Sequence, residues 1–229
     1  MRQWLWDTAR DSLWDVVPRD QRDTRAGLRR RQIVTVVVVL IGAGVLGYSL
    51  RIDPGSPDFY VATLALPVVW FAGAIASGRL HLGRLISGSR PVLQPILLGL
   101  ALSAVFVLGA LVVRQIEPLA VYVHSVLEYA DQGSMSLLLL VTIINGIAEE
   151  LFFRGAAYAA IPRHPVLWTT VAYVVATLAT GNVMLAFAAI LLGTVCGLQR
   201  RASGGVLGPI LTHVTWSSTM LFVLPQLFG

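Results

Sequence analysis

The sequence predicts an all-α, polytopic membrane protein with about seven transmembrane helices in one bundle. Of its 229 residues, 56% are hydrophobic and only 13% are charged, against about 25% charged in a typical globular domain. A bilayer core about 30 Å thick requires about 20 consecutive apolar residues from each spanning helix. The chain meets this requirement in five runs that lack Asp, Glu and Arg: 33–50, 59–78, 91–113, 165–199 and 202–229. These observations exclude the soluble and disordered classes.

The arginines predict how the spans are oriented. We expect spans at about 32–50, 59–77, 92–113, 135–160, 164–179, 183–199 and 205–224. With the N-terminus in the cytoplasm, fourteen of the 17 arginines lie inside, Arg51 and Arg114 lie outside, and Arg154 lies within the membrane. Because arginine concentrates in cytoplasmic loops, this split favours a cytoplasmic N-terminus and an external C-terminus. The absence of lysine is typical of a GC-rich bacterial genome, so we expect a bacterial plasma membrane.

Residues 1–31 are expected to form a cytoplasmic segment that precedes the bundle of residues 32–229. Three tryptophans and a helical spacing of apolar residues favour a short helix in the membrane interface, and a loosely ordered tail anchored by indoles fits equally well. The net charge of +5 could suggest nucleic acid, but arginines beside apolar spans are better explained by anionic lipid headgroups. We therefore expect the lipid bilayer as a partner and no nucleic acid.

Two further segments have a predicted arrangement. Residues 117–131 are expected to form an external interfacial stretch. The span 164–179 is short, so the turn Thr180-Gly181-Asn182 should lie below the outer surface, where it faces protein or water. Glycines in the first and sixth spans predict close helix packing; they are Gly42, Gly44, Gly47, Gly193 and Gly197.

Three ionisable residues interrupt the fourth span, and charges at such depth are functional candidates by default. Glu150 and Arg154 are four residues apart in the favourable order, which predicts an ion pair on one helix face. Glu149 is rotated about 100° from Glu150 and continues a polar ridge with Thr142 and Asn145. Glu149 is therefore the carboxylate predicted to do chemistry. The alternative is a buried charge cluster that only fixes helix register.

His213 is the other ionisable residue deep in a span, and Ser217 lies one turn after it on the same helix face. From their depths, Glu149 and His213 are both expected near the middle of the membrane or in its cytoplasmic half, where they can meet. A glutamate and a histidine in a dry pocket can activate water and stabilise the oxyanion of peptide hydrolysis.

These residues resemble a known family. Glu149-Glu150-x-x-x-Arg154, followed about sixty residues later by a glycine-rich approach to His213-x-x-x-Ser217, is similar to the CAAX prenyl protease and bacteriocin-processing family of intramembrane endopeptidases. The resemblance covers residues 134–224. It implies that Glu149 is the general base, that Glu150 and Arg154 support it, and that His213 stabilises the oxyanion. A peptide or membrane-protein substrate is implied as well.

The chain departs from the family at two positions. A histidine that the family has between the two motifs is absent, and Thr177, Thr180 and Asn182 are the polar side chains that remain there as candidates, with Asn145, for binding substrate. The last motif position, usually Asn or Asp, is Ser217. Family members have been described both as metalloproteases and as metal-independent glutamate proteases. Because one histidine plus carboxylates is a thin set of zinc ligands, no metal site and no cofactor are expected, and zinc would enter only under the metalloprotease description.

Three functions follow as hypotheses. The first is an endopeptidase that uses Glu149-activated water. The second is a catalytically silent relative that acts as a membrane scaffold or an immunity-type binding protein. The third is a transporter or proton-coupled channel, which the nearly apolar first three spans disfavour.

Overall fold

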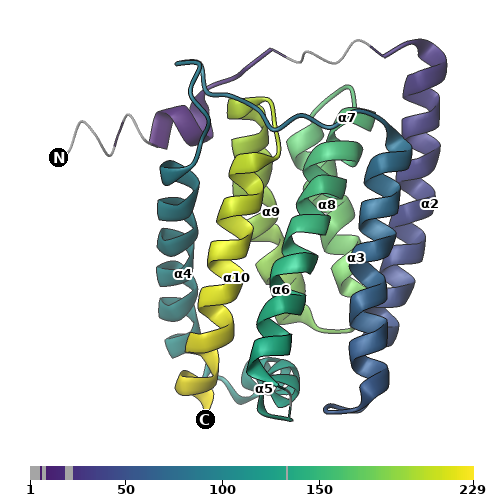
Figure 1. Ribbon diagram of the computed structural model, residues 1–229. Coiled ribbons are helices and arrows are strands. Elements are labelled where there is room, and N and C mark those ends of the chain that lie inside the picture. The colour runs from purple at the N-terminus through teal and green to yellow at the C-terminus, as the bar shows by residue number, and fades with distance from the viewer. Residues whose placement is uncertain (1–5, 7–8, 19–22, 133) are drawn as a thin grey trace.

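The computed structural model describes residues 6, 9–18, 23–132 and 134–229, and its regular structure within these ranges is entirely helical (Figure 1). A short π-helical turn, η1 (Arg10–Trp14), precedes the bundle. The long helices that follow are α2 (Arg25–Ser49), α3 (Pro57–Ser77), α4 (Leu93–Val113), α5 (Glu117–Gln132) and α6 (Met135–Glu150). The α6 helix continues through the π-helical η2 (Leu151–Ala157) into α7 (Tyr158–Ala160), and α8 (Pro165–Leu178), α9 (Val183–Ser203) and α10 (Leu207–Phe228) complete the chain.

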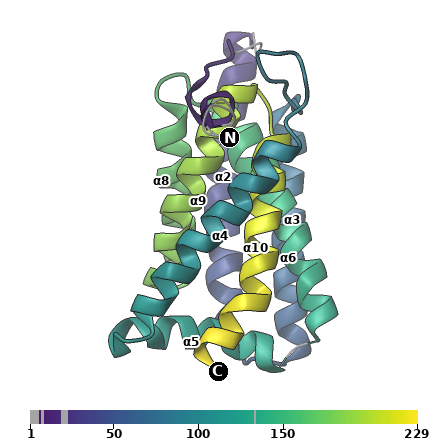
Figure 2. The same cartoon turned by 90° about the vertical axis from the view of Figure 1, so that its left-hand side faces the viewer.

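The predicted number of spans is confirmed. Six helical stretches of the described chain are long and apolar enough to cross a membrane, and α8 is a shorter apolar helix beside them. These elements run roughly parallel to one long axis, whereas α5 lies across the end at which the chain terminates (Figures 1 and 2). The described N-terminal residues and the C-terminus lie at opposite ends of the bundle, as an odd number of crossings requires.

Several helices extend beyond the predicted spans. The first begins at Arg25, seven residues before the predicted start, and the Thr24 side chain caps it by accepting from Gly27 N at 3.1 Å. Arg31 is buried, pairs with Asp23 at 2.6 Å and donates to the Ser77 hydroxyl at 3.4 Å. The α9 and α10 helices likewise continue four residues past their predicted ends. A helix can continue beyond the hydrocarbon core of the membrane. Charge-free runs therefore predict the position of a span more accurately than the residues at which its helix begins and ends.

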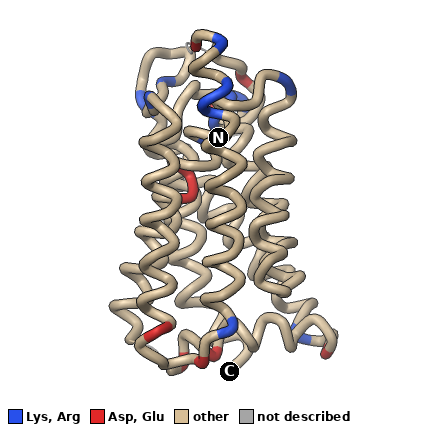
Figure 3. The backbone as a smooth tube through the Cα atoms, turned by 90° about the vertical axis from the view of Figure 1, so that its right-hand side faces the viewer, with Lys and Arg blue, Asp and Glu red and all other residues tan. Residues whose placement is uncertain are grey.

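Charge separates along the bundle axis. Arginines gather at the end from which α2 starts, whereas the opposite end carries several acidic residues and few arginines (Figure 3). This is the distribution from which the sequence predicted the orientation.

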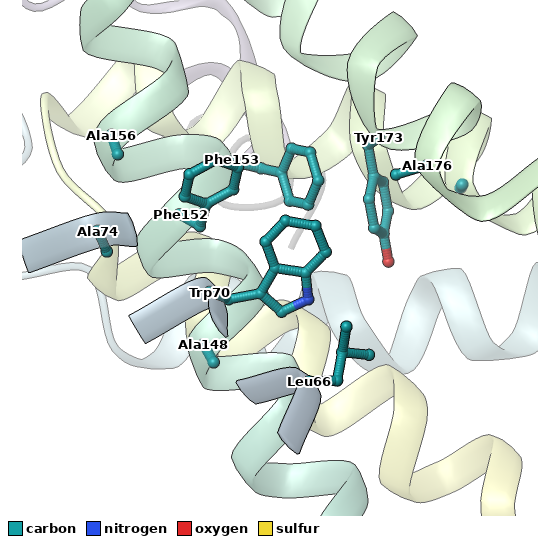
Figure 4. Packing of buried hydrophobic residues seen from close by; sticks show 10 residues of the cluster. Leu66, Trp70, Ala74, Ala148, Phe152, Phe153, Ala156, Tyr173 and Ala176 are labelled. Atoms are coloured by element: carbon teal, nitrogen blue, oxygen red, sulfur yellow. The ribbon is translucent and has the colours of Figure 1, made fainter. Parts of the chain in front are cut away.

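An aromatic cluster forms the centre of the bundle. Trp70 of α3 lies 5.0 Å from Phe152 and 5.1 Å from Phe153 of η2, measured between ring centroids. Phe153 in turn lies 4.9 Å from Tyr173 of α8. Figure 4 shows these rings packed together between small residues such as Ala148 and Ala176. The cluster fixes the rotation of α6, η2 and α8, which carry the residues described below.

The arginine-rich end is closed by the chain itself. The loop after α3 pairs with the α9–α10 turn through Arg84 N to Ser203 O (2.8 Å) and Val206 N to His81 O (2.9 Å). Gly83 and Gly205 make this approach possible, since a Cβ on Gly205 would stand 2.0 Å from the Gly83 nitrogen. Residues 16–18 reach the same end, where Val17 N donates to Arg201 O at 3.1 Å.

The predicted N-terminal interfacial helix is described only in part. Within the described residues it is the five-residue η1, whose Leu13 carbonyl accepts from the Arg201 guanidinium at 3.0 Å. The Trp6 and Trp14 rings lie 5.9 Å apart and both side chains are exposed. The prediction for Trp4 falls outside the described residues.

The predicted interfacial stretch 117–131 is the helix α5, and it supports the turn after the short α8. The Asn182 amide donates to the Tyr122 carbonyl of α5 at 2.6 Å, and its oxygen accepts from Met184 N and Leu185 N at 3.0 Å. Asn182 therefore caps α9 and ties the turn to α5. At its other end α5 is held by Tyr129, whose hydroxyl donates to Ile52 O at 2.8 Å. Burial, with Glu128 and Asp53 nearby, raises the pKa of Tyr129, so this donor keeps its proton.

Candidate functional site

The two motif glutamates occupy different environments. Glu150 and Arg154 have no exposed side-chain surface, and the predicted ion pair is present, with Arg154 Nη1 2.9 Å from Glu150 Oε1. The same Glu150 oxygen lies 2.8 Å from His213 Nδ1 of α10. Glu150 therefore joins α6 to α10, and the histidine bonds to Glu150 and not to Glu149.

Glu149 is the freer of the two carboxylates. It is partly exposed and makes no ion pair with any residue that the structure describes. Its contact is a hydrogen bond of 2.6 Å, which the Tyr173 hydroxyl of α8 donates to Glu149 Oε2. One carboxylate oxygen is thus held by a neutral donor from another helix.

The π-helical stretch η2 follows directly after the glutamates and carries Arg154. Such wide turns are rare and occur frequently at functional sites. The Arg154 guanidinium lies 5.0 Å from the centroid of the Tyr173 ring. The backbone carbonyl of Arg154 accepts from Arg200 Nε at 2.7 Å. Gly193 of α9 leaves the room for it, since a Cβ there would stand 3.1 Å from Arg154 Nη2. The predicted packing role of Gly193 is therefore confirmed.

A cavity of about 300 Å³ lies between α2, α3, α5, α6, α8 and α10. Its polar lining brings together residues that the sequence singled out: Thr142, Asn145, Glu149, His213 and Ser217, with Tyr173 added by the structure. The remaining lining is mostly apolar and includes Phe59, Leu138 and Leu221. Glu149 and His213 therefore do meet, as lining residues of one cavity, although they do not bond to each other.

Asn145 and Ser217 keep hydrogen-bonding capacity toward the cavity that they line. The Asn145 amide donates to the carbonyls of Thr63 (3.2 Å) and Val141 (3.1 Å), and its buried oxygen has no partner among the described residues. The Ser217 hydroxyl makes a long bond of 3.4 Å to Val214 O in its own helix. A hydroxyl so loosely held can turn to another acceptor.

Thr177, Thr180 and Asn182 are placed differently, because none of them is among the residues that line this cavity. The Thr177 hydroxyl donates to Tyr173 O at 2.9 Å and the Thr180 hydroxyl to Thr177 O at 2.7 Å, while Asn182 caps α9. All three side chains thus satisfy nearby backbone groups. The structure does not bring them to Glu149.

The donor set does not fit zinc. Among the described residues no group of three or more His, Cys, Asp and Glu side chains is arranged to hold a metal ion. The Nδ1 atom of His213 and the Oε1 atom of Glu150 are bonded to each other, and that oxygen also binds Arg154. A guanidinium in contact with a would-be ligand competes with a cation for the same lone pairs.

Tyr173 is the site residue that sequence reasoning missed. It lies in an apolar helix, 24 residues from Glu149, and a tyrosine in such a sequence is normally interpreted as a packing residue. One signal was available: a buried tyrosine normally finds a partner for its hydroxyl, and the fourth span supplies the carboxylates that could accept.

The fold and the site define a multi-pass helical membrane protein with a carboxylate-lined cavity inside its bundle. Comparison with protein-family models matches residues 131–219 to the family described as Rce1-like, type II CAAX prenyl endopeptidases. That stretch contains Glu149, Glu150, Arg154, His213 and Ser217, so the resemblance seen in these motifs is confirmed over residues 131–219. No curated protein and no solved structure matched the chain.

Proposed function

We propose that this protein is an intramembrane endopeptidase of the CAAX protease type, in which Glu149 activates the water that hydrolyses a peptide bond. The observation that carries the proposal is the division between the glutamates. Glu150 is fully buried and committed to Arg154 and His213, whereas Glu149 faces the cavity with one oxygen held by Tyr173. The family match supports the reaction class.

The reaction begins at the unbonded oxygen of Glu149. This oxygen accepts a proton from water as the water oxygen attacks the carbonyl carbon of the scissile peptide bond, which forms a tetrahedral oxyanion. Glu149 then delivers the proton to the leaving nitrogen while the C–N bond breaks. The products are a carboxylic acid and an amine, and the carboxylate of Glu149 is regenerated.

The oxyanion is stabilised from α10. Glu150 holds Nδ1 of His213 at 2.8 Å and thereby orients the ring, which leaves its second nitrogen for the oxyanion. Ser217, one turn further along the same helix, adds a hydroxyl donor. Donors fixed before the charge develops are the largest single source of rate acceleration in many enzymes.

Tyr173 acts through Glu149. Its hydroxyl binds Oε2 and so leaves Oε1 for the water. Because the aromatic cluster packs around its ring, the hydroxyl keeps its position when a substrate binds. Tyr173 is therefore a positioning residue. Asn145, with a buried oxygen that lacks a partner, is assigned to substrate binding.

The proposed reaction uses no metal and no cofactor. Because Glu150 Oε1 is hydrogen-bonded to both Arg154 and His213, we expect peptide cleavage to survive strong chelators. The family name refers to prenylated substrates, but we do not propose a prenylated substrate for this protein. We place the protein in a bacterial plasma membrane with the N-terminus in the cytoplasm.

The test is cleavage of a peptide library by the purified protein, with Glu149→Gln as the matched variant. We expect slow cleavage that Glu149→Gln abolishes and chelators leave unchanged. Stoichiometric zinc whose removal ends the activity would replace this proposal with a metalloprotease.

One observation favours a second function, a catalytically silent relative that serves as a membrane scaffold or an immunity-type binding protein. The family's middle histidine is absent, and the polar residues nearby bond to backbone groups outside the cavity. Absence of cleavage in every condition, together with specific retention of a peptide by both the wild type and Glu149→Gln, would favour this function.

A further inference from the structure

Two hollows at the arginine-rich end adjoin each other and differ sharply in chemistry. The first, of about 780 Å³, is lined by the basic side chains of His81, Arg84, Arg90, Arg200 and Arg201 and, among the described residues, by no Asp or Glu. We call it the cationic hollow. The second, of about 860 Å³, runs between α8 and α9 and is lined mainly by aliphatic side chains. We call it the apolar groove.

The two hollows are continuous because they share lining residues. Val17, Pro18, Tyr158 and Arg201 belong to both. Arg201 therefore stands where the charged hollow passes into the apolar groove. Its Nη2 donates to Leu13 O, while its Nε is buried and has no partner among the described residues. A buried guanidinium N–H group without an acceptor destabilises the folded protein, and an anion that accepts from it would remove this cost.

Arg84 and Arg90 supply exposed guanidinium groups on the cationic hollow, whereas Arg200 is buried and bonded to the Arg154 carbonyl. Arg90 is exposed and makes no hydrogen bond or ion pair with any described residue. Arg84 is exposed and donates through Nη1 to Gly88 O at 3.0 Å, which holds the side chain across its own loop. The backbone around it is fixed by the bonds to Ser203 and Val206 already described.

The apolar groove supplies a surface that runs from the cationic hollow along α8 and α9. Leu167, Val175 and Ile190 are 56%, 56% and 47% exposed, and they follow α8 and α9 from the arginine-rich end into the membrane. A ligand that fills both hollows therefore needs an anionic head and an extended hydrocarbon part.

We propose that the cationic hollow and the apolar groove together bind one anionic phospholipid, with its phosphate among Arg84, Arg90 and Arg201 and an acyl chain along α8 and α9. This assignment does not depend on the proposed peptidase activity. A diffuse attraction of basic loops to the membrane surface would need neither the groove nor the buried Arg201 nitrogen.

The test measures lipid retention by native mass spectrometry of the purified full-length protein with phosphatidylglycerol or phosphatidylcholine. We expect phosphatidylglycerol to be retained in preference to phosphatidylcholine. Each arginine near an anionic headgroup contributes about fivefold in affinity, so Arg84→Gln with Arg90→Gln should weaken phosphatidylglycerol binding about thirtyfold. Arg51→Gln with Arg114→Gln removes the same charge at the opposite end and should leave phosphatidylglycerol retention unchanged.

A second pair of variants tests the groove. Val171→Trp would fill it and should lower retention of phosphatidylglycerol, whereas Val112→Trp, on the exposed face of α4, should not. Melting curves verify that each variant is folded. Equal loss from both arginine pairs, or equal retention of the two lipids, would overturn the proposal. Inorganic phosphate that displaces the lipid and stabilises the protein equally well would assign the hollow to a soluble anion instead.

Discussion

At the scale of single residues, the site depends on one oxygen atom. Glu150 Oε1 lies within 3 Å of both Arg154 and His213, so it neutralises the guanidinium and fixes the ring with the same lone pairs. Glu149 shares neither bond. Two adjacent glutamates can therefore be separated by experiment.

We predict that Glu150→Gln and Arg154→Ala each lower the melting temperature and the yield of folded protein. Either change leaves a buried charge without its partner, at a cost of about 3–5 kcal/mol. Glu149→Gln should melt within a degree or two of the wild type, because glutamine can still accept from Tyr173, and should abolish peptide cleavage. Equal destabilisation by Glu149→Gln and Glu150→Gln would make Glu149 structural and remove the proposed base.

Tyr173→Phe tests the positioning role directly. The change keeps the ring in the aromatic cluster and removes the donor to Glu149. A lost hydrogen bond to a charged group should reduce kcat about tenfold to hundredfold, with KM and the melting temperature nearly unchanged. Tyr158→Phe, a buried tyrosine outside the cavity, is the control. An unchanged kcat in Tyr173→Phe would rule the positioning role out.

At the scale of helices, close packing depends on which glycine faces a neighbour. A Cβ on Gly42 of α2 would stand 2.0 Å from the Trp70 ring, whereas a Cβ on Gly44 would meet nothing within 4 Å. We predict that Gly42→Ala destabilises the protein by about 1–3 kcal/mol through overpacking. Gly44→Ala should be neutral or stabilising by up to about 1 kcal/mol, because alanine favours the helix. Thermal melting of the two variants in the same detergent decides the matter.

Sequence patterns located the elements better than the contacts between them. Charge-free runs identified every span except the fourth, which three ionisable residues interrupt, and the spacing of Glu150 and Arg154 predicted their ion pair. Both signals are local. The partner of His213 and the donor to Glu149 are set by how helices rotate against one another. That rotation follows from the packing of Trp70, Phe153 and Tyr173, which no single helix reveals. The π-helical turn that carries Arg154 is likewise invisible in the residue pattern.

At the scale of the whole molecule, the bundle makes a prediction about topology. The described N-terminal residues and the C-terminus lie at opposite ends, and arginines gather at the N-terminal end. We predict that reporters fused at Gly229 are active only when the reporter functions outside the cytoplasm. A fusion active only in the cytoplasm would contradict the proposed orientation and the depth assigned to Glu149.

The short α8 has a consequence for the surrounding lipid. Its 14 residues span about 21 Å, so on this side the protein offers less apolar length than a hydrocarbon core of about 30 Å. The bilayer must thin there, or draw headgroups inward, and each ångström of hydrophobic mismatch costs a fraction of a kcal/mol. We therefore expect water to come closer to the cavity beside α8 than beside the longer helices. If the proposed peptidase activity is measured in bilayers of different thickness, we expect shorter acyl chains to increase its rate by relieving the mismatch.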